Sequence, residues 1–267
     1  MTPFPRGTRI AHCLNGSKFI MDPLTSAAAS GIRSRIESLD LLANNIANAS
    51  VPGFKADHEF YNVYLASEAA DSPEGTSPTL LPVVERKWTD FSQGSLTPTG
   101  NPLDLALNGP GFFMARASSG SLFTRGGSFR LSDQGQLQTQ EGYALLDQKG
   151  DPILLDSSKP IEVSPDGSIR QDGQDLSRIA VMDFKDPAAL AKRGGNYFQT
   201  DLASMPPAQA GQAEVQQGKI EAANSQPAQS AVRLVNIMRQ FETLQKAMAI
   251  GAEMNRSAVQ EVAKVTT

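Results

Sequence analysis

Histidine and aspartate are the residues of this chain that could bind a metal or catalyse a reaction, and their placement favours neither role. The chain has two histidines, His12 and His58. His58 stands next to Glu59, and two adjacent residues do not form a metal-ligand pair. The sequence contains no Gly-x-Ser-x-Gly and no phosphate-binding Gly-x-x-x-x-Gly-Lys. We therefore expect no enzyme, no metal site and no cofactor, and we interpret His58 as solvent-exposed.

Aspartates are frequent in the middle of the chain, where a glycosidase would need two carboxylates facing each other across a cleft. Most of these aspartates stand beside glycine or proline, where the short side chain of Asp stabilises turns. Their spacing also differs from that of an EF-hand calcium loop. The sequence thus favours turn roles for them. They are Asp133, Asp147, Asp151, Asp156, Asp166, Asp172 and Asp175.

Two stretches at opposite ends of the chain have apolar residues at alternating spacings of three and four. The first comprises Ile32, Ile36, Leu39, Ala43 and Ile46. The second comprises Ala231, Leu234, Ile237, Phe241, Leu244, Met248 and Gly251, followed more weakly by Ala258, Val262 and Val265. An average spacing of 3.5 places these residues along one side of a helix, as in a coiled coil. Each seam therefore needs a partner helix.

The partner of each seam is either the other end of the same chain or a neighbouring subunit, and the spacing alone leaves both open. A single apolar stripe in water is marginal, because helix nucleation is costly. We expect both ends to become ordered on incorporation into an assembly. Asn44, Asn45 and Asn48 either fray the end of the first helix or, as we favour, hydrogen-bond across helices and fix their register.

The residues between the seams alternate between short strands and turns. Turn signals recur about every 8–12 residues, which is typical of an antiparallel β domain, a curled sheet or an open barrel. We predict an α+β fold with these segments: an extension at 1–20, disordered or mis-assigned, with Met21 as the start; a helical segment at 21–66; a linker at 67–82; the β domain at 83–202; a second linker at 203–218; and a helical segment at 219–267.

Two features of the β region carry separate expectations. Asp104 interrupts the alternating strand Leu103–Leu107. We place it on the solvent face; the alternative is a buried or subunit-contacting carboxylate that meets Arg125 or Arg130. We expect Phe112 and Phe113 to lie in the core.

The composition excludes several classes of protein. The chain has 267 residues, a net charge of −4 and a pI near 5.3, so nothing in it attracts nucleic acid or anionic lipid. Cys13 is the only cysteine, which excludes an internal disulfide. We find no run of about 18 apolar residues and no cleavable secretory signal. We expect no small-molecule substrate and no membrane insertion.

Four sequence blocks follow one another along the chain: Leu42–Asn48 with Pro52–Lys55; Asn101, Pro102, Leu103 and Asp104 through Gly111, Phe112 and Phe113; Thr124–Phe129 with Val163–Gly167; and Gln217–Glu221 with Ala223, Asn224 and Arg239–Glu242. In this order, the blocks resemble the bacterial flagellar axial proteins of the rod and hook. Together they cover nearly the whole chain from Met21. Within the family, the chain looks most like the proximal-rod proteins of the F type, and next like the distal-rod proteins of the G type. Residues 1–20 and Pro227 depart from the family pattern.

The resemblance implies a structural subunit of the basal-body rod. Its terminal helices would pack into a tube wall, its β domain would contact adjacent subunits, and it would leave the cell through the flagellar type III export apparatus without a cleaved signal, to assemble in the periplasm. Its partners would be itself and other rod and hook subunits. The subunit-interface residues would be Ile32, Ile36, Leu39, Ala43, Asn44, Asn45, Ile46, Asn48, Leu234, Ile237, Phe241, Leu244 and Met248. The alternatives are a distal-rod or hook protein and, in another class, an exported adhesin that binds through its β domain.

Overall fold

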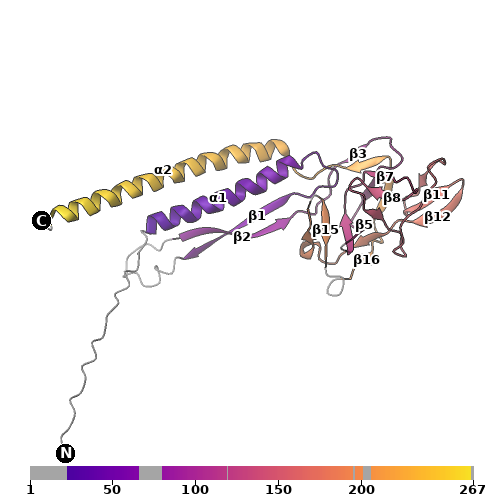
Figure 1. Ribbon diagram of the computed structural model, residues 1–267, viewed down its shortest axis with the longest axis horizontal. Coiled ribbons are helices and arrows are strands. Elements are labelled where there is room, and N and C mark those ends of the chain that lie inside the picture. Colours follow the sequence, from indigo (N-terminus) through magenta and orange to yellow (C-terminus); the bar gives the residue numbers. More distant parts are fainter. Residues whose placement is uncertain (1–22, 66–79, 119, 195, 201–205, 266–267) are drawn as a thin grey trace, which may run out of the picture.

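A long helical arm projects from a β domain in the computed structural model (Figure 1). The structure describes residues 23–65, 80–118, 120–194, 196–200 and 206–265. The predicted extension at 1–20 and most of the predicted linker at 67–82 lie outside these residues. Helix α1 (Pro23–Ala47) and helix α2 (Pro227–Val265) form the arm, as the two apolar seams predicted.

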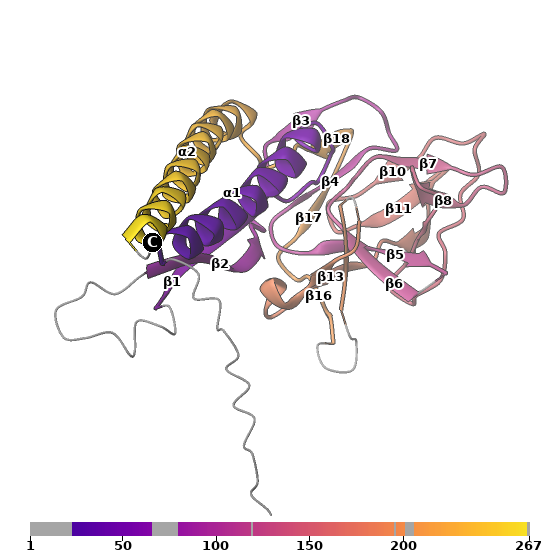
Figure 2. The same ribbon diagram turned by 60° about the vertical axis from the view of Figure 1, so that its left-hand side comes forward.

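The two helices pack side by side along the arm (Figures 1 and 2). Gly31 of α1 lies against Leu244 of α2, so closely that a Cβ at residue 31 would be 3.2 Å from a Leu244 methyl group. Small residues on α1 allow this approach, because they leave room for the larger side chains of α2. The intramolecular helix pair, one of the two arrangements left open by the sequence, is therefore present.

A β-hairpin lies along the other side of α1 and gives the arm a third layer (Figures 1 and 2). Strands β1 (Asp57–Leu65) and β2 (Leu80–Thr89) pair antiparallel, with Asp57 opposite Thr89 and a bulge after Phe60. The expected helical segment 21–66 thus ends in a strand. Gly53, with φ of 70°, redirects the chain after α1 into this strand.

The β domain consists of short strands, and all strand pairs among its described residues are antiparallel, which confirms the predicted fold class. The strands and one 3-10 turn are β3 (Leu96–Pro98), β4 (Leu105–Asn108), β5 (Phe112–Ala117), β6 (Gly120–Thr124), β7 (Phe129–Leu131), β8 (Leu137–Thr139), β9 (Ala144–Leu145), β10 (Glu162–Val163), β11 (Ser168–Gln171), β12 (Gln174–Arg178), β13 (Val181–Asp183), η2 (Pro187–Ala189), β14 (Ala191–Lys192), β15 (Tyr197–Gln199), β16 (Ala208–Gln209), β17 (Glu214–Gln217) and β18 (Lys219–Glu221).

The largest sheet has the order β14-β15-β6-β5-β9-β8-β7, with β13 pairing β5 and β16. Phe113, at 0% exposure, packs edge to face against Phe129 in the main core, and Phe112, at 3%, joins a second aromatic cluster with Phe184 and Phe198. Both phenylalanines are core residues, as predicted.

The prediction of a linker at 203–218 is wrong for the C-terminal part of that segment, which forms strands. Strand β16 pairs β13, and β17 pairs β4 over four residues, with Val215 buried opposite Leu107. The Ala- and Gln-rich composition suggested a linker, but a short edge strand needs only one inward apolar side chain. The chain thus returns from the β domain to α2 through paired strands.

Several aspartates serve turns, as predicted. Asp147 accepts hydrogen bonds from the backbone N–H groups of Lys149 and Asp151, and Asp166 accepts one from Ser168. Asp156 does the same for Ser158, whose hydroxyl and N–H lower the pKa of that carboxyl.

Candidate assembly site

The junction between the helical arm and the β domain is built around three buried charged side chains. Lys55 follows α1, Arg125 follows β6, and Glu221 ends β18, just before α2. The Lys55 ammonium donates to Glu221 Oε1 at 2.6 Å, and Arg125 donates to Glu221 Oε2 at 3.2 Å. Their side chains are 1%, 5% and 0% exposed for Lys55, Arg125 and Glu221. This Lys55–Glu221–Arg125 cluster ties the exit of α1, the β domain and the entry to α2 together.

Backbone groups complete the cluster. Lys55 also donates to the carbonyl of Ser92, Arg125 donates to that of Gly109, and Glu221 Oε1 accepts the N–H of Gly94. Burial lowers the pKa of Lys55 and of Arg125, and the carboxylate of Glu221 opposes that shift in both. Two cations share one anion, so Glu221 is the residue on which the cluster depends.

Backbones approach each other closely around this cluster. A Cβ at Gly127 would lie 1.7 Å from the carbonyl oxygen of Leu105, and one at Gly53 would lie 2.2 Å from the carbonyl carbon of Arg125. The N–H of Gly53 donates to the carbonyl of Glu221. Glycine is required at both positions because no side chain fits.

Asparagines fix the geometry of the arm, although not in the predicted way. The Asn45 amide donates to the Asp57 carbonyl at 2.7 Å and accepts the Asp57 N–H at 3.0 Å. Asn45 thus sets the register of β1 against α1, and the prediction of a hydrogen bond across helices is wrong for this residue. Asn48 donates to the carbonyl of Asn44 one turn earlier, just past the C-terminal end of α1. Asn224 bonds the N–H of Ala56 and the carbonyl of Asp90.

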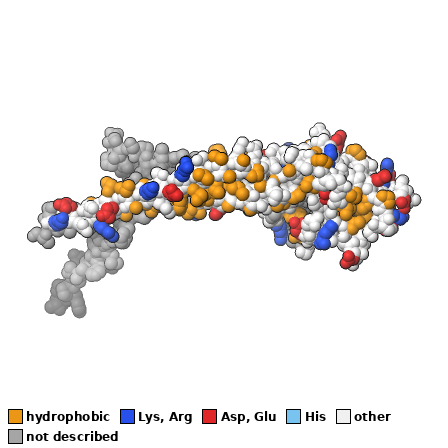
Figure 3. All heavy atoms as spheres, turned by 90° about the horizontal axis from the view of Figure 1, so that it is seen from above, with side chains coloured by type: hydrophobic (Ala, Val, Ile, Leu, Met, Phe, Trp, Pro, Cys, Tyr) orange, Lys and Arg blue, Asp and Glu red, His pale blue; other side chains and the backbone are white. Residues whose placement is uncertain are grey.

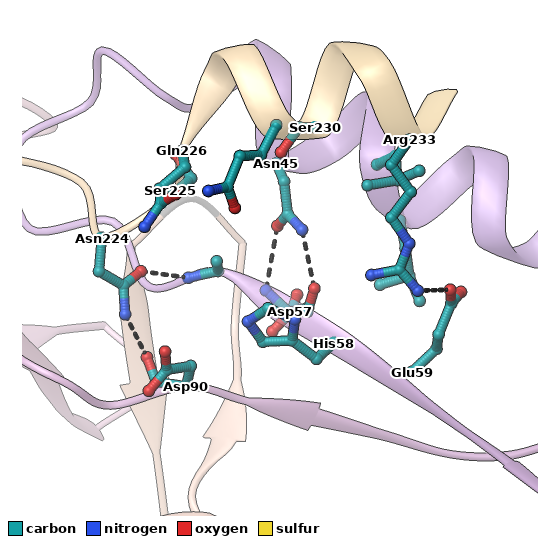
Figure 4. A pocket seen from close by; sticks show the side chains of 14 residues that line it. Asn45, Asp57, His58, Glu59, Asp90, Asn224, Ser225, Gln226, Ser230 and Arg233 are labelled. Atoms are coloured by element: carbon teal, nitrogen blue, oxygen red, sulfur yellow. Dashed lines mark hydrogen bonds and ion pairs between the residues drawn. The ribbon is translucent and has the colours of Figure 1, made fainter. Parts of the chain in front are cut away.

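A pocket of about 200 Å³ lies between the end of α1, the start of β1 and the start of α2 (Figure 4). Some of its polar side chains already have partners: Arg233 of α2 contacts Glu59 of β1, and the Asn224 amide donates to the backbone carbonyl of Asp90. Among the described residues, no group of three His, Cys, Asp or Glu side chains could hold a metal ion. The expectation of an exposed His58 is wrong, because its ring is half-buried and stacks on Trp88 with centroids 5.0 Å apart.

Asp104 is buried at 8% exposure, so its predicted place on the solvent face is wrong. Its carboxylate accepts from the Asn101 amide, and Arg125 instead pairs with Glu221 while Arg130 reaches the Thr139 carbonyl. Because the Asp104 backbone bridges Ser128 and bonds Gly218, the residue is enclosed by the strands around it. The carbonyl of Pro102 accepts a hydrogen bond from the Gln217 amide, and Leu103 packs at the edge of the core. Gly111, with φ of 130°, turns the chain into β5.

The predicted interface residues of α2 face α1. Ile237 is buried, and the others are half-buried between the two helices: Leu234, Phe241, Leu244 and Met248. The predicted seam of α1 is different. Its buried side is formed by other residues, namely Ala28, Gly31, Ser34, Ser38, Leu41, Leu42 and Asn45. Ile36 and Ala43 are exposed, and Ile32, Leu39 and Ile46 are half-buried. The assignment of these residues to a subunit interface stays a prediction.

Large apolar side chains are exposed on the side of α2 that faces away from α1. This outer stripe consists of Val232, Val235, Met238, Ile250 and Met254, which are 47–64% exposed. Successive members are separated by three, four or twelve residues, which keeps them on one broad side of the helix. Figure 3, seen from above, shows apolar side chains gathered along the arm. Among the described residues, no helix is both long and apolar enough to cross a membrane.

The sequence did not predict the Lys55–Glu221–Arg125 cluster as a site, although each of its residues lies in one of the four sequence blocks that resemble the family. The available signal was the position of all three charges beside Gly-containing turns in those blocks. The ion pair between Lys55 and Glu221 could not be predicted from the sequence, because the two residues are 166 positions apart.

Near the junction, Tyr197 offers a test by titration. Its hydroxyl donates to Glu141, and burial, with that hydrogen bond, raises the pKa of the phenol. The folded pKa lies above the unfolded value of about 10. The stabilisation is therefore present below about pH 10 and is lost as the pH rises through the folded pKa. We expect a titration followed by ultraviolet absorbance to end with a tyrosine step above the usual value of about pH 10, and Tyr197→Phe to remove that final step. A final step that survives in the variant would refute the assignment.

The fold and the junction define a class of protein: a subunit that carries paired terminal helices, with an exposed apolar stripe, on an antiparallel β domain. Two family models match the chain. The one described as "Flagellar hook protein FlgE/F/G D1 domain" matches residues 106–171, and "Flagella basal body rod protein" matches residues 27–55.

Individual relatives agree. The flagellar basal-body rod protein FlgF of Caulobacter vibrioides is 36% identical over 85% of this chain and 92% of its own length. FlgF of Mesorhizobium japonicum is 28% identical over 83% and 90%, and the rod protein FlgG of Buchnera aphidicola (subsp. Schizaphis graminum) is 27% identical over 88% and 97%. The chain belongs to the family of flagellar basal-body rod proteins, F type. It is a structural subunit of the rod, a class that is not enzymatic, and its partners are other rod and hook subunits.

Proposed function

We propose that this subunit assembles into the rod through the outer surfaces of its helical arm, in the periplasm, after export by the flagellar type III apparatus without a cleaved signal. The observation that supports this proposal is the outer stripe of α2. The inward seam of α2 is already covered by α1 within one chain, so a lateral contact needs another apolar surface, and the outer stripe supplies it.

The stripe is suited to contact between subunits. An apolar side chain such as Met or Val contributes about 1.5–3 kcal/mol when it becomes fully buried. Five such residues that are about half exposed can stabilise a contact without being needed for the fold of the free subunit. The exposed and half-buried residues of the α1 seam, Ile36 and Ala43 among them, extend the same role to the first helix.

The β domain would then sit on the outside of the assembly and hold the arm in a fixed orientation through the Lys55–Glu221–Arg125 cluster. We further propose that both helices gain most of their rigidity on incorporation. Hydrogen exchange on dilute subunit is expected to show weak protection across residues 231–262. Strong protection there in the monomer would contradict this part of the proposal.

Charging the stripe tests the assembly role. Val235→Glu combined with Met238→Glu places two carboxylates on an exposed helical surface. We expect the free energy of unfolding of the purified subunit to change by only about 0.5 kcal/mol per site. We expect incorporation into basal bodies, and with it swimming, to be lost, because burying unpaired carboxylates in a contact is costly.

The matched control is Gln240→Glu, which adds a charge at an exposed polar position of the same helix. This variant should assemble normally. Normal basal bodies and full motility in the double variant would show that the outer stripe is not a subunit contact.

A further inference from the structure

A second apolar patch lies on the β-hairpin of the arm. Phe60 and Trp88 are 58% and 46% exposed, and His58 stacks on Trp88. His58 is directly opposite Trp88 in the antiparallel register, so the two side chains share one side of the hairpin, and Phe60, two residues along β1, shares it too. We call these three residues the aromatic patch.

Phe60 and Trp88 form the exposed part of the aromatic patch, and His58 also lines the pocket between α1, β1 and α2 (Figure 4). Between His58 and Phe60, the side chain of Glu59 is only 3% exposed and contacts Arg233 of α2. Because side chains alternate along a strand, the residues on either side of Glu59 project to the opposite side of the hairpin. The aromatic patch and the outer stripe of α2 thus lie on opposite sides of an arm whose layers run α2, α1, hairpin (Figure 1).

We propose that the aromatic patch of one subunit packs on the outer stripe of α2 of a second copy of this chain. This inference rests on the proposed function and specifies the contact. The two patches differ from each other, so the contact between them is head-to-tail: each added copy covers one patch and presents another. Such heterologous contacts produce open helical assemblies rather than closed pairs, as a rod requires.

The size of the aromatic patch is consistent with a subunit that stays monomeric until it is incorporated. A fully buried Phe or Trp covers about 150–250 Å². The half-exposed pair therefore offers roughly 200 Å², well below the roughly 800 Å² per partner of a stable complex. One such contact is weak in solution, and several acting together in a lattice are strong.

Photo-crosslinking in cells that assemble flagella tests the contact. A benzophenone amino acid replaces Phe60 in the full chain, with Leu154, 63% exposed on the β domain, as the matched position. After illumination, we expect an adduct of twice the subunit mass from position 60. Its crosslinked peptide should fall within residues 232–254, and position 154 should give several times less of it. Trp88→Glu should remove the adduct.

The outcomes separate this inference from the proposed function. If the subunit is present in purified basal bodies and position 60 crosslinks to another peptide, to another protein or to nothing, the contact proposed here is refuted and the assembly role stands. If the subunit is absent from basal bodies, both are refuted. Circular dichroism of the Trp88→Glu subunit should match the parent, since Trp88 is nearly half exposed.

Discussion

Glu221→Gln is expected to lower the free energy of unfolding by about 3–5 kcal/mol. The substitution keeps the shape of the side chain and removes the one anion that two buried cations share. Lys55 and Arg125 then lie in a low-dielectric junction without a counter-charge, and the loss of a partner from a buried ion pair costs far more than the pair contributes when intact. Chemical denaturation of the purified subunit measures the effect.

Two further variants make this test specific. Asp175→Asn removes a partner of the Arg170–Asp175 pair, whose side chains are 65% and 48% exposed for Asp175 and Arg170, and should cost less than about 1 kcal/mol. Lys55→Met in the Glu221→Gln background should recover part of the loss, because it removes one uncompensated cation. A loss for Glu221→Gln as small as that of the surface pair would mean that the cluster does not hold the junction.

Leu244→Pro is expected to destabilise the arm by about 3 kcal/mol or more and to abolish flagellar assembly. Proline in a helix interior removes a backbone hydrogen bond, and its ring clashes with the preceding turn. Leu244 is also the residue that meets Gly31 of α1, so a kink there separates the two helices. Circular dichroism should show reduced helix content, and the cells should not swim.

Leu244→Ala separates the backbone effect from the packing effect. Alanine keeps the helix and removes the half-buried side chain, so a smaller loss is expected, with most of the helix signal retained. Swimming by the Leu244→Pro strain would contradict the requirement for a continuous second helix.

The periodic parts of the fold could be predicted from the sequence. The spacing of Leu234, Ile237 and Phe241 predicted a helix and its buried side, because apolar residues three and four positions apart lie on one side of a helix. The turn roles of Asp147 and Asp166 were also readable, since these hydrogen bonds are local. What the spacing could not decide was which partner a seam meets, and on α1 the buried side falls on Ala28, Gly31 and Ser34 rather than on the isoleucines.

The junction could not be predicted, because its contacts join distant segments. The sequence suggested that Asn45 contacts another helix. Its amide instead forms two hydrogen bonds with the backbone of Asp57, which follows the reversal of the chain at Gly53. Asp104 looked exposed from strand alternation, but the neighbouring segment at Gly218 covers it. In each case the residue that makes the contact is distant in the sequence, and only the folded arrangement of the strands brings it close.

The bond between Lys55 and Glu221 has a consequence for the order of folding. It closes a loop of 166 residues, and by the usual logarithmic dependence this costs about 2.5 kcal/mol more entropy than closing a ten-residue turn. The short hairpins of the β domain can form early, while the α1–α2 pair must wait for the last fifth of the polypeptide. A chain truncated before residue 221 would therefore keep a largely intact β domain and a first helix that packs only on the hairpin β1–β2.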